Sequence, residues 1–415
     1  MNILLIHQAF ASLDEPGGTR HHEFARHLQA LGHRVTIITG QGSYLTGVQI
    51  SQSKRMLYHV DDVGVEIWRS AGYHAWHRSF FHRILSFIDF MVRSFLIGLR
   101  VEQVELVWGT SPPIFQAVSA ALLARWRRVP FLLEVRDLWP YFAVATGVLR
   151  SRILIRMSNW LESWLYRAAD VVVVNSPGFI EHVRERGAQC VELVPNGVDC
   201  TVFSQAESSG ALRERLSIRD GFLVLYAGAH GLSNDLVTVL QAAQELKLEP
   251  EIHFVLAGAG KEKNRLVEQA QQWDLGRVHF IDPVPKQDMP ALLAEADAGL
   301  AILMAIEAYK TTYPNKVFDY MAACLPVVCA IDGVVRKVVE QGQAGIFVQP
   351  GSPHALAEGI LRLAADRDGA KRMGASGRRW VCAHHDRNNL ASNLAMIMEA
   401  TLRLKDKAWS DDAGA

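Results

Sequence analysis

The chain has 415 residues, 49% of them hydrophobic, which exceeds the size at which one hydrophobic core stops growing and therefore predicts two domains. Lysine plus arginine equals aspartate plus glutamate at 43 each, which disfavours a nucleic-acid-binding protein because that class shows a basic excess. The five cysteines lack metal-ligand spacing and are expected to be reduced thiols of a cytoplasmic protein.

Short apolar runs alternate with helical stretches, a pattern typical of parallel α/β sheets. In the first half we expect strands at Asn2–Ile6, Val35–Thr39, Leu106–Gly109, Phe131–Val135, Asp170–Val174 and Cys190–Val194. In the second half we expect strands at Leu223–Ala227, Ile252–Ala257, Val278–Ile281, Gly299–Leu303, Pro326–Ala330 and Gly345–Val348. The fold class is therefore α/β, with two Rossmann-like halves joined by a polar linker over 200–220.

The expected domains cover residues 1–200 and 201–380. A helix over 381–404 is expected to pack back on the first domain, and 405–415 to form a disordered tail. The first residues lack a basic lead and a long apolar run, so no signal peptide is expected. No segment offers about 18 uncharged apolar residues, so no membrane-spanning helix is expected.

In chain order, the first strand leads to Gly17 and Gly18, followed by helical spacing. Paired glycines let backbone amides approach a ligand at a helix start, although most such pairs are simply turns. Two further junctions of strand, glycine and helix occur at 226–231 and 257–261. Neither is a complete Gly-x-Gly-x-x-Gly, and no acidic residue follows at the dinucleotide distance, which disfavours a nicotinamide cofactor.

The segment 79–100 is apolar over most of its helical circumference, with polar residues along a narrow stripe. Trp76 and the arginines Arg78, Arg83, Arg93 and Arg100 accompany it, which is typical of an interfacial membrane helix. A long helix buried between the sheet and a neighbour would show the same composition. Both interpretations stay open from the sequence.

Three charges close a buried strand in the sequence Glu134-Val135-Arg136-Asp137-Leu138-Trp139-Pro140. The carboxyl ends of parallel strands are where α/β folds keep their ligands, so Arg136 and Asp137 are candidates for substrate contact. An internal ion pair between arginine and aspartate is the structural alternative. The run Asp366-Arg367-Asp368 matches the metal-binding Asp-x-Asp pattern, but no strand precedes it, and we interpret it as a solvated surface run.

The most informative stretch runs from Tyr313 to Val328. Pro314 at a first helical position predicts a helix start, whose free N–H groups favour an anion. Asp319 is set back by about a turn and a half, at a distance suited to a ribose behind a diphosphate. Lys310 and Lys316 flank the start of this helix, and either could neutralise the diphosphate.

Together these motifs resemble glycosyltransferase family 4, a retaining family with the two-domain GT-B fold. The motifs that carry the resemblance are Gly17-Gly18-Thr19-Arg20, Gly32-His33-Arg34-Val35-Thr36, Val194-Pro195-Asn196-Gly197-Val198-Asp199, the strand ending at Gly228, and Pro314 to Val328. The runs 136–140 and 147–149 are similar to those of surface-polysaccharide and colanic-acid transferases.

The resemblance implies an enzyme of the hexosyltransferase type that moves a sugar, an N-acetylated or deoxy hexose, from a UDP-sugar to a lipid-diphosphate-linked saccharide. The product would enter O-antigen, capsule or exopolysaccharide synthesis, with the enzyme cytoplasmic and peripheral on the inner membrane face. No metal and no cofactor are expected. It implies a donor site built from Gly17, Gly18, Gly228, His230, Gly231, Val284 beside the base, Tyr313, Pro314, Asn315, Lys316 and Asp319.

Catalytic roles are expected for Asp137, Lys310 and Thr311, and acceptor or membrane contacts for Arg20, Arg136, Phe80, Phe81, Arg83 and Phe87. The family motif Glu-x7-Glu places its second acid at Asp319 and its first at Thr311, which carries no charge, while Glu307 lies four residues too early. Cys324 stands where the family ends the helix with glycine, and a left-handed cap there would cost roughly 1–2 kcal/mol.

Two alternatives of other classes remain. A nucleotide-sugar 2-epimerase shares the fold and donor site without transferring the sugar to an acceptor. A non-catalytic partner subunit would bind nucleotide without consuming donor, as the missing first glutamate suggests.

Overall fold

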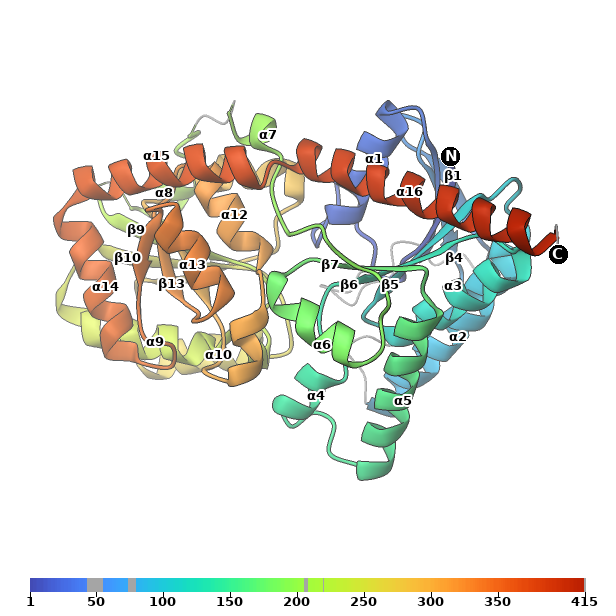
Figure 1. Ribbon diagram of the computed structural model, residues 1–415. Coiled ribbons are helices and arrows are strands. Elements are labelled where there is room, and N and C mark those ends of the chain that lie inside the picture. Colours follow the sequence, from blue (N-terminus) through green and yellow to red (C-terminus); the bar gives the residue numbers. More distant parts are fainter. Residues whose placement is uncertain (43–54, 74–79, 205–207, 219, 414–415) are drawn as a thin grey trace. The chain divides into compact units, whose positions relative to one another are not determined.

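The computed structural model describes residues 1–42, 55–73, 80–204, 208–218 and 220–413 (Figure 1). The chain divides into two compact units. The first unit contains Met1–Ser12, Gly17–Pro195 and Asn388–Ala415, and the second contains Leu13–Pro16 and Asn196–Arg387. Each unit is built on its own sheet.

The first unit has an eight-stranded sheet in the order β3-β4-β2-β1-β5-β6-β7-β8. Its strands are β1 (Asn2–Ile6), β2 (Arg34–Gly40), β3 (Leu57–Val60), β4 (Glu66–Ser70), β5 (Leu106–Ser111), β6 (Phe131–Val135), β7 (Val171–Val174) and β8 (Val191–Leu193). All neighbours pair in parallel except β3 with β4, which are antiparallel. The six strands expected from sequence are present.

The strands β3 and β4 were not expected. Three of the four residues of β3 are exposed, because it is the edge strand, and β4 has only two apolar residues, Ile67 and Trp68, between polar ones. Neither strand therefore forms a continuous apolar run, which is the signal that marks a strand buried on both faces.

The helices of the first unit are α1 (Arg20–Ala30), α2 (Phe80–Gly98), α3 (Ile114–Arg127), α4 (Tyr141–Ala145), α5 (Arg152–Ala168), η1 (Pro177–Phe179), α6 (Ile180–Glu185) and α16 (Arg387–Ala413). Leu390, Leu394 and Met398 of α16 belong to the same core as Ile3 and Val35 of the sheet. The end of the chain is thus part of the first unit, and α16 continues to Ala413 through most of the segment expected to be a disordered tail.

The second unit has a six-stranded parallel sheet in the order β11-β10-β9-β12-β13-β14. The strands are β9 (Phe222–Ala227), β10 (Ile252–Ala257), β11 (Val278–Ile281), β12 (Ala298–Ile302), β13 (Val327–Ala330) and β14 (Gly345–Phe347), all of which were expected. The longer helices are α9 (Leu236–Glu245), α10 (Lys263–Gln272), α12 (Asn315–Ala322), α13 (Val334–Gln341), α14 (Pro353–Ala365) and α15 (Arg367–His384).

Short helices complete the second unit: α7 (Cys200–Ser204), α8 (Ala211–Arg215), η2 (Leu232–Asn234), η3 (Leu246–Leu248), η4 (Lys286–Asp288), α11 (Met289–Leu293) and η5 (Glu307–Thr311). The segment 200–220, expected to be a linker, thus contains two of them. Asp366, in the run expected to be a solvated surface, caps α15 by accepting a hydrogen bond from the N–H of Gly369 at 2.8 Å.

Two cysteines depart from the expectation of reduced thiols. Cys200 of α7 and Cys382 of α15 form a disulfide, with their Cα atoms 5.8 Å apart. The two residues are 182 positions apart in the chain, so their spacing in the sequence carried no sign of the pairing. Cys190, Cys324 and Cys329 are free thiols.

Cys324 adopts the left-handed conformation that the family's glycine would take, with φ of 57°. Its N–H donates a hydrogen bond to the carbonyl of Met321 at 3.1 Å, and the N–H of Leu325 donates to the carbonyl of Tyr320 at 2.9 Å, which closes α12.

Cys324→Gly is therefore expected to raise the free energy of unfolding by about 1 kcal/mol, because glycine removes the strain of a Cβ at positive φ. Chemical denaturation measures this change. Cys324→Ala is the matched control and should leave stability unchanged, since alanine keeps the Cβ; equal stabilisation by both variants would assign the effect to the thiol instead.

Candidate functional site

In the second sheet β9 and β12 lie side by side. After β9 the chain adds β10 and β11 on one side of this pair, and after β12 it adds β13 and β14 on the other side. The strand order therefore reverses between β9 and β12. In open α/β sheets, ligands bind beyond the carboxyl ends of the strands at such a switch point. Two loops follow these strands: residues 228–231 after β9, and the segment through η5 to Pro314 after β12. Of the residues expected to hold a donor, Gly228, His230 and Gly231 lie on the first loop, Tyr313 and Pro314 end the second, and Asn315, Lys316 and Asp319 follow on α12.

Pro314 precedes α12 in an extended conformation, with φ −66° and ψ 126°, and the first helical residue is Asn315, one position later than expected. Lys316 follows in the first turn. Its ammonium nitrogen is buried, has no hydrogen-bond partner among the described residues, and lies 3.7 Å from the ring centroid of Tyr226. Burial lowers the pKa of Lys316 to about 7. A buried ammonium held only by an aromatic face is suited to an anionic ligand.

Gly228 makes room for this lysine, since a Cβ there would lie 2.8 Å from the Lys316 nitrogen. Gly258 makes room for Gly228 in turn, because a Cβ at Gly258 would lie 1.8 Å from the Gly228 carbonyl oxygen. The loops after β9 and β10 therefore pack backbone against backbone. This close packing positions the loop at 228–231 directly beside the start of α12.

His230 is fully buried on this loop, and neither ring nitrogen has a hydrogen-bond partner among the described residues. Burial, reinforced by the charges of Lys263 and Lys316, lowers its pKa to about 4. The side-chain oxygen of Asn315 is likewise buried without a partner in the described part of the chain. Buried polar groups are normally satisfied, so an imidazole, an ammonium and an amide left open on adjoining loops indicate a ligand site.

Asp319 lies one turn further along α12, and its carboxylate accepts a hydrogen bond from the Lys286 ammonium at 2.5 Å. Both side chains are largely buried. Lys286 belongs to η4, directly after the loop containing Val284 at the carboxyl end of β11. The predicted ribose contact is thus paired with a lysine that sequence analysis missed; the partners are 33 residues apart, and no local pattern joins them.

The first unit carries a buried charged cluster at the carboxyl end of β6. Glu134 accepts hydrogen bonds from Arg20 at 2.7 Å, from His21 at 2.8 Å and from the Trp108 indole at 3.1 Å. Burial by itself would raise the pKa of Glu134, but the charged and hydrogen-bonding groups of His21 and Arg20 outweigh it and hold the pKa well below its ordinary value. The cluster therefore contains a permanent carboxylate.

Arg20, expected to contact the acceptor, uses its guanidinium inside this cluster. Besides Glu134 it donates to the carbonyls of Val194 at 2.6 Å and Pro195 at 2.8 Å. It thereby secures the chain where the first unit ends. The described contacts of Arg20 are internal, and a contact with an acceptor stays a prediction.

Asp137 and Arg136 follow β6. Arg136 donates to the carbonyl of Pro112. The Asp137 side chain is exposed, yet desolvation by the surrounding protein raises its pKa to about 6 against the opposing charge of Arg136. The exposure of the Asp137 side chain, rather than its raised pKa, makes this residue suited to contact a substrate. Gly17 and Gly18 also lie in the first unit, on the loop before α1.

Both units of the chain match known protein families. The family described as "Glycosyl transferases group 1" matches residues 210–380, and "Glycosyl transferase 4-like domain" matches residues 17–197. The putative colanic acid biosynthesis glycosyl transferase WcaI of Escherichia coli K12 is 26% identical over 355 residues, covering 81% of this chain and 86% of that protein.

Two solved structures share the fold. Sucrose-phosphate synthase from Thermosynechococcus elongatus superposes with a TM-score of 0.78 at 18% identity, covering 97% of this chain and 99% of that one. Anabaena HepE in complex with UDP and glucose superposes with a TM-score of 0.72 at 17% identity, covering 96% and 100%.

The chain belongs to the family 4-like glycosyltransferases. It has the GT-B fold and is a nucleotide-sugar-dependent enzyme of the glycosyltransferase class. The family's first glutamate is replaced here by Thr311, whose hydroxyl donates to the carbonyl of Ala308 at 2.7 Å. Glu307 does not supply the missing charge at the site, because its carboxylate is exposed and pairs with Lys310 at 2.8 Å.

Lys310 is 44% exposed, and its ammonium lies 4.0 Å from Asp332 as well as beside Glu307. From the sequence either lysine could neutralise the diphosphate, with Lys310 expected to be catalytic and Lys316 to bind the donor. In the structure Lys316 is the buried cation beside the loop at 228–231. Tyr313, between the two lysines, uses its carbonyl to accept a hydrogen bond from the Asn196 amide at 2.6 Å. That bond joins the Pro-Asn-Gly-Val-Asp motif to the start of α12 in this glycosyltransferase.

The residues expected at a membrane lie on α2. Phe81 is exposed, Arg83 is half-buried, and Phe87 is half-buried with its ring stacked on Phe115 of α3 at 6.2 Å. The side chain of Phe80 and the segment 74–79, with Trp76 and Arg78, lie outside the described residues. None of the described helices is long and apolar enough to cross a bilayer.

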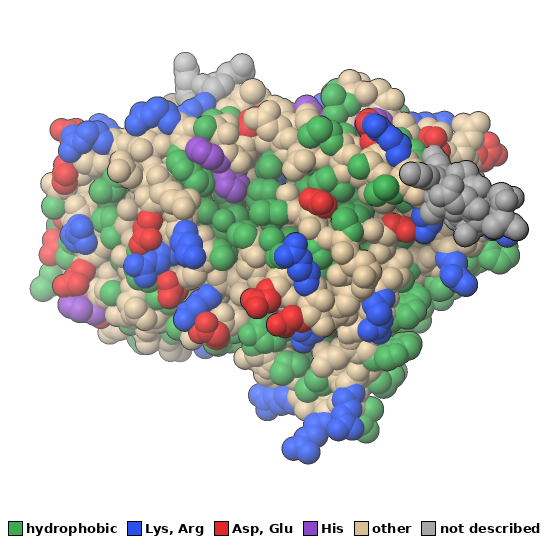
Figure 2. All heavy atoms as spheres, viewed as in Figure 1, with side chains coloured by type: hydrophobic (Ala, Val, Ile, Leu, Met, Phe, Trp, Pro, Cys, Tyr) green, Lys and Arg blue, Asp and Glu red, His purple; other side chains and the backbone are tan. Residues whose placement is uncertain are grey.

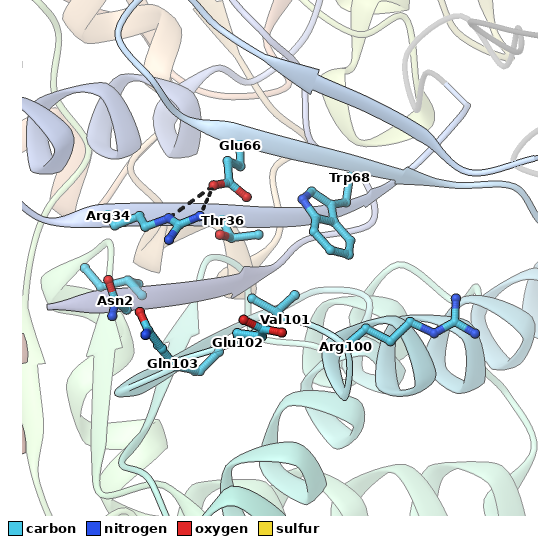
Figure 3. A pocket seen from close by; sticks show the side chains of 11 residues that line it. Asn2, Arg34, Thr36, Glu66, Trp68, Arg100, Val101, Glu102 and Gln103 are labelled. Carbon is cyan, nitrogen blue, oxygen red and sulfur yellow. Dashed lines mark hydrogen bonds and ion pairs between the residues drawn. The ribbon is translucent and has the colours of Figure 1, made fainter.

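A separate hollow lies at the amino ends of β1 and β2, with a volume of about 490 Å³ (Figure 3). Arg34 pairs with Glu66 across its wall, and Trp68 lies beside them. It is at the opposite end of the strands from the edge where parallel sheets keep their ligands, so it is not part of the donor site.

Proposed function

We propose that this glycosyltransferase moves a sugar, an N-acetylated or deoxy hexose, with retention from a UDP-sugar to a lipid-diphosphate-linked saccharide. The reaction would belong to surface-polysaccharide synthesis at the cytoplasmic face of the membrane. The observation that carries the donor half of this proposal is the set of buried, unpartnered groups of Lys316, His230 and Asn315 at the switch point of the second sheet. The UDP complex of HepE and the colanic acid assignment of WcaI support the choice of nucleotide and pathway.

The proposed mechanism stabilises the leaving group. As the bond between the anomeric carbon and the diphosphate oxygen breaks, negative charge grows on the diphosphate. The Lys316 ammonium, the amino end of α12 and the backbone amides at 228–231 would neutralise it. The acceptor hydroxyl attacks the same face of the sugar, and its proton passes to the departing phosphate oxygen. Thr311 carries no charge, so the transition state would depend on the leaving-group side.

Asp319 would accept hydrogen bonds from the ribose hydroxyls, with Lys286 holding the carboxylate in place. Asp137 would contact the sugar or the acceptor hydroxyl from the first unit. These assignments separate two tasks: the residues of α12 and the β9 loop bind the donor, and Asp137 acts in the transfer step. The separation can be tested by measuring donor binding and turnover independently.

The test incubates the enzyme with UDP-, GDP- and ADP-sugars, with and without membrane lipid extract, and follows nucleotide release by mass spectrometry. We expect UDP release only when lipid is present.

Asp137→Asn, a matched variant without the charge, should lower turnover at least tenfold while leaving UDP affinity unchanged. Sugar isomerisation without acceptor would instead indicate a 2-epimerase. UDP binding without donor consumption under any acceptor would indicate a non-catalytic subunit, and an unchanged rate for the variant would remove Asp137 from the mechanism.

A further inference from the structure

The helix α2 exposes a stripe of apolar residues along its length. The exposed residues recur every three or four positions along its length: Phe81, Leu85, Ile88, Val92 and Leu96, followed by Leu99 just after the helix. The opposite face holds Ser86 and Ser94, both buried, and the Ser94 hydroxyl hydrogen-bonds to Ser119 of α3 at 2.9 Å. The same face buries Phe90 and Ile97 in the core. α2 is therefore apolar on both sides, and one of its two apolar stripes lies on the surface, which a helix that only covered the core would not show.

The same feature continues on the neighbouring helices. α3 packs against both α2 and α5. α3 exposes Leu122 and Trp126, and α5 exposes Ile153, Met157 and Trp160, again at helical spacing. Trp126 and Trp160 are 73% and 65% exposed. We call the exposed apolar residues of α2, α3 and α5 the three-helix face; hydrophobic side chains gather along the part of the surface where these helices lie (Figure 2).

The charged residues of the three helices are mostly arginines. The three helices contain seven arginines, no lysine and only two acidic residues, Asp89 and Glu162. Asp89 is paired with Arg93 at 2.9 Å. Glu162 is buried and bound by His182 and Arg186, at 3.0 and 2.8 Å. Neither carboxylate therefore offsets the exposed arginines, among them Arg125 on α3 and Arg152 and Arg156 on α5.

We propose that the three-helix face docks on a bilayer rich in anionic lipids, with the apolar residues inserted at the headgroup boundary and the arginines on lipid phosphates. Apolar stripes flanked by arginine, with exposed tryptophan, are the combination that interfacial helices use. An association with a second copy of the chain would set arginines against arginines. The proposal deepens the proposed function, since a lipid-linked acceptor lies in such a bilayer, and it places α5 beside α2 in membrane contact.

The test measures binding of the full chain to vesicles of phosphatidylcholine with or without 30% phosphatidylglycerol by co-sedimentation (roughly the anionic fraction that gives a strong surface potential). We expect binding only with the anionic lipid, weakening as salt rises. Arg125→Gln, Arg152→Gln and Arg156→Gln should each weaken it about fivefold, and the triple variant about a hundredfold. Trp160→Ser with Met157→Ser should abolish detectable binding at the same protein concentration.

Leu248→Ser with Arg379→Gln is the control, because both residues are exposed and belong to the second unit, whereas the three-helix face belongs to the first, and binding should not change. Salt-independent binding to phosphatidylcholine alone would overturn the anionic preference. A dimer in light scattering, lost in the Trp160 variant, together with no vesicle binding, would assign the face to a second copy. The assay contains no donor or acceptor, so absent vesicle binding beside intact sugar transfer would overturn this inference alone.

Discussion

Lys316→Met is expected to weaken UDP binding by roughly ten- to a hundredfold, because hydrogen bonds to a charged group contribute about 1.5–3 kcal/mol. The buried ammonium of Lys316 is the cation beside the loop at 228–231, and methionine fills a similar volume without charge. Isothermal titration calorimetry with UDP measures the effect. Lys310→Met is the matched control: Lys310 is exposed and paired with Glu307, so its loss should change affinity less than threefold.

The same lysine should make UDP binding depend on pH. The pKa of Lys316 is about 7 without ligand, and the diphosphate charge should raise it in the complex. Binding then takes up a proton between the two pKa values, so affinity is full below pH 7 and falls by up to tenfold per pH unit above it. Lys316→Met should flatten this slope. A pH profile identical in wild type and variant would contradict the assignment of Lys316 to the diphosphate.

The stability of the unliganded protein should change in the opposite direction. Burial lowers the folded-state pKa of Lys316 below its unfolded value, which is about 10.4. The folded state therefore disfavours the proton, and stability rises as pH increases from about 7 towards 10.4. Lys316→Met should remove this rise and should be at least as stable as wild type at pH 7. Loss of UDP affinity in a variant of undiminished melting temperature separates a binding role from a folding defect.

Glu134→Gln is expected to lower the free energy of unfolding by about 3–5 kcal/mol, because it leaves the buried Arg20 guanidinium without its counter-charge. The glutamine keeps the size of the side chain, so the loss reports charge and hydrogen bonding rather than a cavity. Thermal and urea unfolding measure it. The depressed pKa of Glu134 means that this contribution is present above the unfolded pKa of about 4.3 and is lost as pH falls towards the folded value.

Glu66→Gln is the matched control for Glu134→Gln. Glu66 also pairs with an arginine on the same sheet, but Arg34 is 58% exposed, so the change should cost under about 1 kcal/mol. Equal losses in the two variants would show that burial of the cluster around Arg20 does not strengthen it. A loss confined to Glu134→Gln would mark this cluster as the main electrostatic support where the first unit ends, at Val194 and Pro195.

The central strands of both sheets could be predicted because parallel strands buried on both faces appear as continuous apolar runs. The strands β3 and β4 could not, because β3 is an exposed edge strand and the polar residues Glu66, Arg69 and Ser70 leave β4 without such a run. Within the candidate donor site, the consecutive residues from Tyr313 to Asp319 could be picked out from the sequence as one motif. Its long-range partners were not: Lys286 meets Asp319 from 33 positions away, and Asn196 meets Tyr313 from 117.

The sequence alone determined the fold class, the enzyme family and the position of α12, because periodicity and contiguous motifs are local properties of the chain. Only the tertiary structure decided which of Lys310 and Lys316 is the buried cation, since burial depends on packing against Tyr226 and Gly228. It also decided that α2 exposes one stripe of apolar residues as well as burying another, because composition does not tell which apolar residues face the core. Both features depend on contacts between elements that are far apart in the chain, and the sequence alone does not show which elements make those contacts.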